Sequence, residues 1–386
     1  MLNLFINIIN YPFRKLKSFL KRRLGWLNTP CIILYRGFGN KEQFYLRGRV
    51  IEDTGLAKPE SDDHLWENFL AMIKRYSSTG IPEQKVQIQL GEKQYNCIAD
   101  EDGYFEIESA LPNPSLNYDE WQTVKGSLVS HDYTDNQTHP SLAKGEILAA
   151  DSNHSFGVIT DIDDTILISH STNVRKKLKL MLFKNAKTRL PFDGASAFYQ
   201  ALYQGPNLEK NHPFFYVSSS EWNLYDLLVD FCEHHDFPKG PFLLKDAQIH
   251  LKKIWKAGGG NHHHKYEKIC RIFDMYPHLP FILVGDSGQH DAEIYSELSQ
   301  KHPNRILAIY IRDVRPSRHQ AVKDIANELA KKNIEMVLVK DTEEAALHAL
   351  KHGFLHPEAI QAIVDEKQLN QAMDAEFFQI LEKMTE

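Results

Sequence analysis

Short apolar runs alternate with amphipathic segments through the second half of the chain. Helical patterns, for example residues 222–234 and 290–302, separate the apolar runs. Strands and helices that alternate in this way are typical of a doubly wound parallel sheet. We therefore predict an α/β fold with strands at residues 156–161, 214–217, 242–244, 281–284 and 305–311, and a sixth candidate at 336–339.

Residues 31–150 have a different pattern, in which short alternating segments are separated by turn residues. A small, antiparallel, β-sandwich-like domain is the architecture that this pattern favours. The region holds no catalytic constellation, since acids such as Asp100 and Asp102 are typical of turns. We expect this accessory domain to position the following domain or to bind a protein partner that the sequence does not identify. Its strands are predicted at residues 32–36, 44–50, 85–90 and 104–107, with a further pair of strands within 121–129 and a helical or loop insertion near 65–76.

The first 30 residues form a basic, amphipathic segment. Residues 1–30 contain six lysines and arginines and no acid, and their apolar residues recur at helical spacing. Such a segment can lie on an anionic membrane surface, but it can equally pack on the protein's own core or form a basic arm in solvent. No apolar run approaches the roughly 18 residues of a membrane span. At the other end, residues 354–386 are expected to form a helical extension.

Composition narrows the class of protein. The chain has 386 residues, 42% of them hydrophobic, which is enough for more than one core. A net charge of -6 argues against a general nucleic-acid-binding protein. The four cysteines are widely scattered, so we expect reduced thiols and a cytoplasmic protein, with attachment to a membrane surface as an option.

Carboxylates follow the first predicted strand of the α/β region directly. The strand runs into Asp161, Asp163 and Asp164, with Thr165 next. Residues two apart in an extended segment share a face, so Asp161 and Asp163 are expected to project together beyond the strand end. Aspartates also end strands and cap helices, which is the simpler interpretation of any one of them. Three together favour a site for a hard cation such as Mg²⁺.

Two further strands of this region end in polar residues suited to chemistry. Ser218 and Ser219 precede a predicted helix, where hydroxyl and amide groups suit a phosphate. Another strand ends in Gly285-Asp286, with Asp291 close behind. Between them, a glycine-rich loop leads to Lys265, which could neutralise both a phosphate and the carboxylates. Three adjacent histidines at 262–264 are better explained by an exposed loop than by zinc, because no pattern completes a ligand set.

These residues together resemble the four motifs of the haloacid dehalogenase superfamily of phosphotransferases. The motifs are DxDxT at residues 161–165, a strand ending in Ser218, Lys265, and Gly285-Asp286 with Asp291. The local sequence is similar to the actin-patch-associated type of Mg²⁺-dependent phosphatidate phosphatase. The likeness covers about half the chain, and it suggests a catalytic domain at 151–353. Glu221 and Ala292 depart from it, since that family often has proline there, but neither supplies chemistry.

The resemblance implies a two-step phosphatase mechanism. Asp161 is expected to attack phosphorus and form an aspartyl-phosphate, while Asp163 protonates the leaving alkoxide and then activates water. Mg²⁺ is expected to be held by Asp161, the carbonyl of Asp163 and Asp286, with Asp291 supporting the metal site.

The phosphate contacts are implied in the same way. Ser218, with Ser219 next to it, is expected to bind the phosphoryl group, and Lys265 to balance charge on that group and on Asp161. Thr165 is expected to fix the turn rather than to touch the substrate.

Three interpretations of the function remain open. A basic, apolar segment at 174–183, together with the N-terminal segment, suits docking on an acidic phospholipid surface, which favours hydrolysis of phosphatidate to diacylglycerol and phosphate. In the first alternative, both segments have ordinary structural roles and the enzyme hydrolyses soluble phosphate esters. In the second, the chain is a membrane-recruited binding protein with a silent phosphatase fold.

Overall fold

A computed structural model describes residues 30–52, 80–110, 120–129, 142–150, 154–162, 193–208, 211–246 and 263–385. The predictions for the N-terminal segment up to residue 29, the insertion near 65–76, residues 163–165 and the segment 174–183 lie outside these residues. The chain divides into two compact units. The first takes in the described parts of Met1–Tyr35, Tyr45–Pro112 and Gln122–Ile147, and the second those of Arg36–Phe44, Asn113–Trp121 and Leu148–Glu386. The finer boundaries expected from sequence stay predictions.

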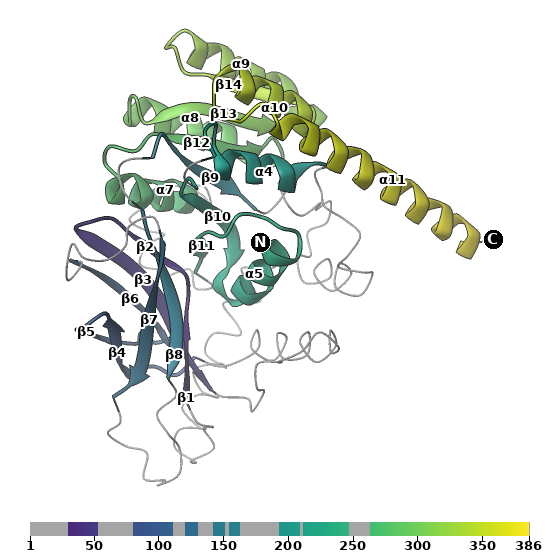
Figure 1. The fold of residues 1–386 in the computed structure, drawn as a ribbon. Coiled ribbons are helices and arrows are strands. Elements are labelled where there is room, and N and C mark those ends of the chain that lie inside the picture. The colour runs from purple at the N-terminus through teal and green to yellow at the C-terminus, as the bar shows by residue number, and fades with distance from the viewer. Residues whose placement is uncertain are drawn as a thin grey trace. The chain divides into compact units, whose positions relative to one another are not determined.

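The β-rich region forms one eight-stranded sheet, drawn in purple to blue in Figure 1. Its strand order is β1-β3-β2-β8-β7-β4-β5, and β6 pairs with β3. The strands are β1 (Pro30–Leu34), β2 (Gly37–Gly39), β3 (Gln43–Glu52), β4 (Lys85–Leu90), β5 (Lys93–Ile98), β6 (Tyr104–Ala110), β7 (Glu120–Leu128) and β8 (Ala143–Ala149).

Alternation of polar and apolar residues explains these strands. In β4, Val86, Ile88 and Leu90 are buried, whereas Lys85 and Gln89 point to solvent. The period of two matches the pleat of a strand with one covered face. β4 pairs antiparallel with both β5 and β7. The prediction of a β-rich region is therefore confirmed, but the pair of strands expected within residues 121–129 is wrong, because that segment runs on as the single strand β7.

The α/β region is built on a six-stranded sheet in which every recorded pairing is parallel. Its order is β11-β10-β9-β12-β13-β14. Every residue of β9 is buried, which explains its continuous apolar sequence. The prediction of an α/β parallel sheet is confirmed, and the sixth candidate strand is present. The strands are β9 (Gly157–Asp161), β10 (Phe214–Glu221), β11 (Phe242–Lys245), β12 (Phe281–Asp286), β13 (Ile306–Arg312) and β14 (Met336–Val339).

The strand order reverses direction beside β9. After β9 the chain forms β10 and β11 on one side and then returns to form β12, β13 and β14 on the other. The carboxyl ends of β9 and β12, which are adjacent, therefore flank the point where ligands bind in open parallel sheets. Asp161 and Asp286 are the last residues of these two strands.

Helices pack in two groups around this sheet. α4 contacts α10 and α11, whereas α8 contacts α7 and α9. β10 shows why both faces are covered: Phe214 packs against Tyr199 of α4, and the next residue, Phe215, packs against Tyr276 and Phe38. The helices are α4 (Ala195–Gln204), α5 (Tyr225–His234), α7 (His263–Met275), α8 (Asp291–Lys301), α9 (His319–Ala330), α10 (Thr342–Lys351) and α11 (Ala359–Thr385), with 3-10 turns at Trp222–Leu224 and Pro316–Arg318.

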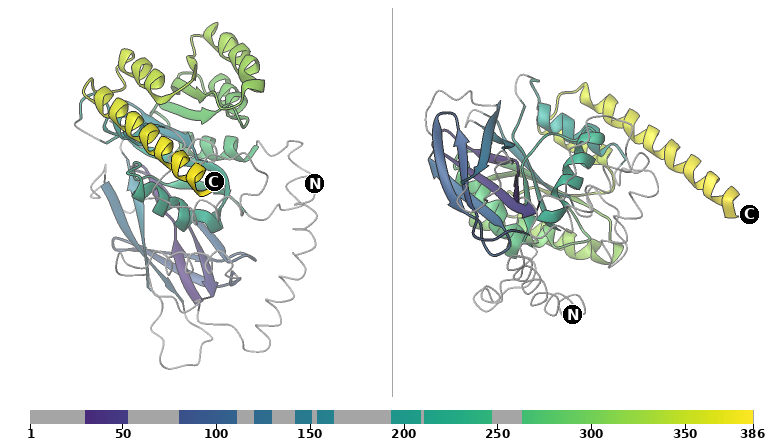
Figure 2. Two further views of the ribbon diagram at one scale, coloured as in Figure 1. Left: turned by 90° about the vertical axis from the view of Figure 1, so that its right-hand side faces the viewer. Right: turned by 90° about the horizontal axis from the view of Figure 1, so that it is seen from below.

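The C-terminal helix α11 belongs to this second unit. It begins against α4 and α10 and then continues beyond them (Figure 2). Oε2 of Glu366 accepts a hydrogen bond of 2.7 Å from the amide of Ala197, in the first turn of α4. Because the first amides of a helix have no partner within it, this contact ties α11 to α4. None of the helices in the described ranges is both long and apolar enough to cross a bilayer.

Candidate active site

Asp161 lies fully buried at the end of β9. Its Oδ1 accepts a hydrogen bond of 2.8 Å from the amide of Ile162. Its Oδ2 lies 2.9 Å from the Nζ of Lys265 and 3.3 Å from the side-chain amide of Gln289. Donors from three places in the chain therefore fix the orientation of this carboxylate.

Asp286 lies at the end of the neighbouring strand β12 and shapes the loop that follows. Its Oδ1 accepts hydrogen bonds from the amides of Gly288, at 2.5 Å, and of Gln289, at 3.0 Å. An aspartate that bonds to amides two and three residues ahead closes a tight turn. This turn brings Gln289 back over the sheet edge to Asp161.

Asp291 starts α8 and completes an acidic cluster. Its Oδ2 accepts a hydrogen bond of 3.2 Å from the amide of Asp286, and its Oδ1 lies 2.6 Å from the Nζ of Lys265. Three carboxylate oxygens lie within 4.8 Å of one another here, one each from Asp161, Asp286 and Asp291. All three residues are buried. The close approach of Asp291 requires Gly285, because a Cβ there would lie 2.6 Å from the Asp291 Oδ2.

Lys265 stands between the carboxylates. It is buried on α7, and its ammonium donates to Asp161, to Asp291 and, over 3.2 Å, to Oε1 of Gln289. An ammonium that contacts two buried carboxylates offsets part of their desolvation cost. The expectation that Lys265 balances charge at Asp161 agrees with this geometry.

Ser218 and Ser219 lie on the other neighbour of β9. Val217 is paired with Asp161, so Ser218 is the first residue of β10 beyond the end of β9. Ser218 is buried, its Oγ accepts a hydrogen bond of 2.8 Å from the amide of Ser220, and its carbonyl accepts one of 3.2 Å from Nζ of Lys268. Ser219 is exposed. The strand thus brings one hydroxyl to the edge of the acidic cluster and turns the next toward solvent.

Buried polar groups behind the cluster keep their protons. Burial, together with the negative charge of Asp291 and Asp161, raises the pKa of Tyr295 well above its ordinary value, and its hydroxyl donates to the carbonyl of Val284 at 3.0 Å. Burial likewise raises the pKa of Tyr199. The same cause lowers the pKa of Arg312, the partner of Asp286 on β13, to about 10. At neutral pH the tyrosines are therefore neutral supports, and Arg312 stays positively charged.

The acidic cluster has the donor set of a hard divalent cation. Three buried carboxylates converge there, and the ammonium of Lys265 contacts Asp161 and Asp291. Excess buried negative charge is costly unless a cation compensates it. Oxygen donors without nitrogen or sulfur suit Mg²⁺. The residues present therefore fit a magnesium ion.

The structure brings together Asp161, Asp286, Asp291 and Lys265, with Ser218 on the adjacent strand. Asp163, expected as acid and base and as a metal ligand, lies outside the described residues. The side chain of His264 is largely exposed; partial loss of water around its ring, followed by the positive charge of Lys268, lowers its pKa.

Sequence reasoning gave no role to two residues that contact this site. Gln289 bonds to both Asp161 and Lys265, and its position three residues after the strand end at Gly285-Asp286 was the available signal. Lys268 reaches the carbonyl of Ser218 because it follows Lys265 by three residues on one face of α7.

Comparisons with known proteins address the same region. Residues 156–313 match the sequence model of the family described as phosphatidate phosphatase APP1, catalytic domain. The chain is 32% identical over 199 residues to phosphatidate phosphatase APP1 of Saccharomyces cerevisiae, an alignment that covers 50% of this chain and 32% of the yeast protein. It is 24% identical over 284 residues to an uncharacterized protein of Schizosaccharomyces pombe, covering 70% of this chain and 43% of that protein.

The sequence matches cover only part of each relative. The chain spans less than half of the length of either relative. A solved carbohydrate acetylesterase from Xanthomonas citri shares 8% identity at a TM-score of 0.26, over 74% of this chain and 68% of that one, a likeness too weak to inform the fold. The sequence matches are stronger and coincide with the strands that carry Asp161, Ser218 and Asp286. The segment from residue 156 to residue 313 is therefore similar to the catalytic domain of the APP1 phosphatidate phosphatase family.

Proposed function

We propose that this protein is a Mg²⁺-dependent phosphatase that hydrolyses phosphatidate to diacylglycerol and phosphate at a membrane surface. The observation that carries the proposal is the convergence of Asp161, Asp286 and Asp291, which bring one oxygen each to within 4.8 Å at a parallel-sheet edge. The relative named phosphatidate phosphatase supports the reaction and the substrate class. We also propose that the second unit has the doubly wound haloacid dehalogenase fold, because its strand order reverses beside β9.

Asp161 is the nucleophile in this proposal. One of its carboxylate oxygens attacks phosphorus, the bond from phosphorus to the glycerol oxygen breaks, and an aspartyl-phosphate forms. The leaving alkoxide takes a proton from Asp163, which then removes a proton from water. That water attacks phosphorus, so phosphate leaves and the carboxylate of Asp161 is restored. The donors of Ile162, Lys265 and Gln289 hold Asp161 in one orientation, which reduces the entropic cost of attack.

Positive charge around Asp161 makes the attack on an anionic phosphate feasible. Mg²⁺, for which Asp161, Asp286 and Asp291 are the ligand candidates with the carbonyl of Asp163, would neutralise the phosphoryl oxygens when bound. Lys265 contributes a permanent positive charge at the same place. Ser218 and Ser219 are the proposed hydrogen-bond donors to the phosphoryl group. Lys268, next to Ser218, adds a second ammonium.

The proposal also specifies that the substrate is a lipid at a membrane surface. The basic, apolar segments 1–30 and 174–183 suit an acidic phospholipid surface, since they combine positive charge with apolar side chains. We propose a cytoplasmic protein that attaches peripherally to such a surface. The accessory β-rich domain is then free to serve as a positioning or partner-binding module.

The decisive experiment compares hydrolysis of phosphatidate in mixed micelles with hydrolysis of a panel of soluble sugar and nucleotide phosphates. We expect Mg²⁺-dependent release of phosphate from phosphatidate. Asp161→Asn, which keeps the size of the side chain, should reduce turnover at least about 1,000-fold, because an amide is not a nucleophile. Chelation of Mg²⁺ should abolish turnover in the parent protein.

The two alternatives give different results in this assay. A strong preference for soluble esters would defeat the lipid assignment while leaving a phosphatase. If no ester were hydrolysed with Mg²⁺ present, and if Asp161→Asn still bound phospholipid vesicles as the parent does, the protein would be a binding protein. Circular dichroism of both proteins checks that the substitution preserves the fold.

A further inference from the structure

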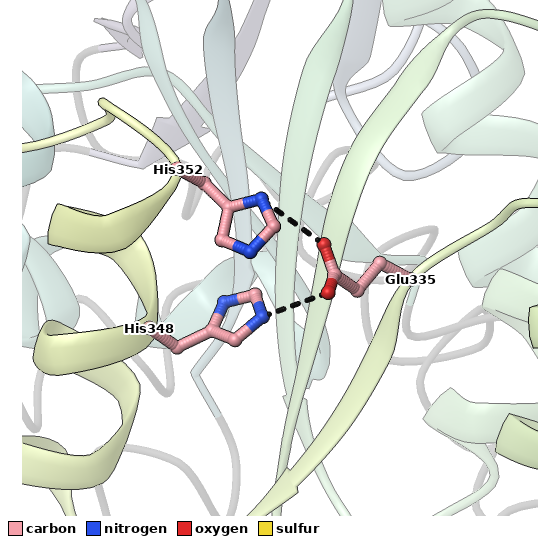
Figure 3. Close-up of side chains that lie close together, drawn as sticks. All are labelled: Glu335, His348 and His352. Atoms are coloured by element: carbon pink, nitrogen blue, oxygen red, sulfur yellow. Dashed lines mark ion pairs between the residues drawn. The ribbon is translucent and has the colours of Figure 1, made fainter.

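A second cluster of metal-ligating side chains lies on the opposite edge of the parallel sheet. Glu335 immediately precedes β14, His348 is in the last turn of α10, and His352 is its C-cap residue. Figure 3 shows the carboxylate of Glu335 facing both imidazole rings. Because β14 starts at the amino edge of the sheet, this cluster is separate from Asp161 and Asp286, which end their strands at the carboxyl edge.

The distances within the cluster match those between ligands of one metal ion. Oε1 of Glu335 lies 3.0 Å from Nε2 of His348, and Oε2 lies 3.3 Å from Nδ1 of His352. One possible ligand atom from each residue lies within 4.8 Å of the others. Tetrahedral zinc with ligands at about 2.0–2.1 Å places adjacent ligand atoms about 3.3 Å apart. Little side-chain movement would be needed for all three to reach one ion.

Local structure holds these side chains in place. The two histidines are four residues apart at the end of a helix, so they share a face, and their rings stack with centroids 4.3 Å apart. The backbone carbonyl of Glu335 accepts a hydrogen bond of 2.8 Å from the amide of Ile309, which fixes its position beside β13. The carbonyl end of α10 also carries partial negative charge, which favours a bound cation.

Tyr310 supplies the outer hydrogen bond that metal-binding histidines usually have. Its hydroxyl lies 3.1 Å from Nδ1 of His348. When Nδ1 of His348 donates to this oxygen, the lone pair of Nε2 points toward Glu335. Outer partners of this kind fix the tautomer and orientation of a ligand.

We propose that Glu335, His348 and His352 form a zinc site that ties the end of α10 to the start of β14. Two nitrogens and one carboxylate oxygen suit Zn²⁺, whereas Mg²⁺ prefers oxygen ligands alone. The half-exposed position of Glu335 and His352 leaves room for water as the fourth ligand. The site is thus chemically different from the acidic cluster at the other edge.

Zinc titration of the full chain in excess Mg²⁺ tests this proposal, since Mg²⁺ occupies oxygen-only sites. We expect the parent to bind one more Zn²⁺ ion than the double variant His348→Ala/His352→Ala. Glu335→Gln, which keeps the size of the side chain, should lower the zinc affinity about 100-fold, and Tyr310→Phe about 10-fold. The midpoint of thermal unfolding should rise with Zn²⁺ in the parent and not in the double variant.

Two control variants locate the bound ion. His356→Ala removes a nearby histidine outside the cluster and should leave the zinc affinity unchanged. Asp286→Asn alters the acidic cluster and should also leave it unchanged. If the parent and the double variant bound the same amount of Zn²⁺, or if Asp286→Asn alone removed the extra ion, the proposal would be wrong, and the cluster would be only a histidine–carboxylate hydrogen-bond network.

Discussion

The ammonium of Lys265 lies 2.9 Å from Oδ2 of Asp161, and both side chains are buried. The same ammonium lies 2.6 Å from Asp291. One cation therefore links the carboxylate at the end of β9 with the first residue of α8, although the three residues come from distant parts of the chain. This triad places one positive and two negative charges in direct contact inside the buried site.

Removal of Lys265 should destabilise the fold strongly in the absence of divalent metal. Lys265→Met leaves buried carboxylates without their cation, so we expect the free energy of unfolding to fall by about 3–5 kcal/mol. Urea denaturation with chelator measures this loss. Added Mg²⁺ should recover part of it, because a bound cation takes over the neutralisation.

A matched control for this variant is Lys301→Met, which removes an exposed ion pair with Glu297. Its free energy of unfolding should stay nearly that of the parent. Equal losses in the two variants would show that the buried triad has no special role. In Lys265→Met/Asp291→Asn, the combined loss should be smaller than the sum of the single losses.

Gly285 should be required for the metal site rather than for the strand. A methyl group at this position would lie 2.6 Å from Oδ2 and 2.8 Å from Cβ of Asp291. Gly285→Ala should therefore displace Asp291 and lower the Mg²⁺ affinity at least about 10-fold, measured from the Mg²⁺ dependence of turnover. In an Asp291→Gly background, which removes both of these atoms, the same substitution should have little further effect, and an undiminished effect there would contradict the steric explanation.

Gln289 should act as a positioning residue for Asp161. Its side chain donates to Asp161 and accepts from Lys265. Gln289→Ala should lower kcat about 10-fold with little change in KM, because orientation of the nucleophile matters most in the transition state. Gln289→Glu should be worse, since a new carboxylate would repel Asp161. A change confined to KM would instead indicate a substrate contact.

Asp341 should make the stability of the C-terminal part depend on acid pH. Its side chain caps α10 by accepting from the amide of Glu344 at 3.0 Å, and it lies 2.8 Å from Nζ of Lys367. Burial alone raises the pKa of Asp341, but these hydrogen bonds bring that pKa below its ordinary value. A carboxyl with a lowered pKa stabilises the fold above the pKa of the unfolded chain, about 3.9, and this contribution is lost as the pH falls through the folded value.

Two substitutions at this position separate capping from charge. Asp341→Ala should cost about 1 kcal/mol at neutral pH through the lost cap. Asp341→Asn keeps the cap, so at neutral pH it should cost less, and its stability should fall less steeply in acid than that of the parent. Urea unfolding across the acid range measures both effects. An identical acid profile in the parent and Asp341→Asn would show that the ion pair with Lys367 contributes nothing.

The local pattern of apolar residues was sufficient to predict the strands of the α/β region. The buried runs that become β9 and β12 are continuous and apolar, because both faces of a parallel sheet are covered. The weak candidate at 336–339 also forms β14, since it pairs with β13. Chemical type and order along the chain selected Asp161, Asp286, Asp291 and Lys265, which the structure brings together, and Ser218 on the adjacent strand; their roles stay predictions.

The amino-acid sequence by itself determined which residues end the strands and that carboxylates, a lysine and serines follow them in order. Only the tertiary structure decided that Asp161, Asp286 and Asp291 share one cluster, that Gln289 closes over it, and that Glu335 meets two histidines at the opposite edge. Strand order and helix direction, set by packing between distant segments, create these contacts. A local pattern records which face a residue occupies, but not which distant side chain it meets.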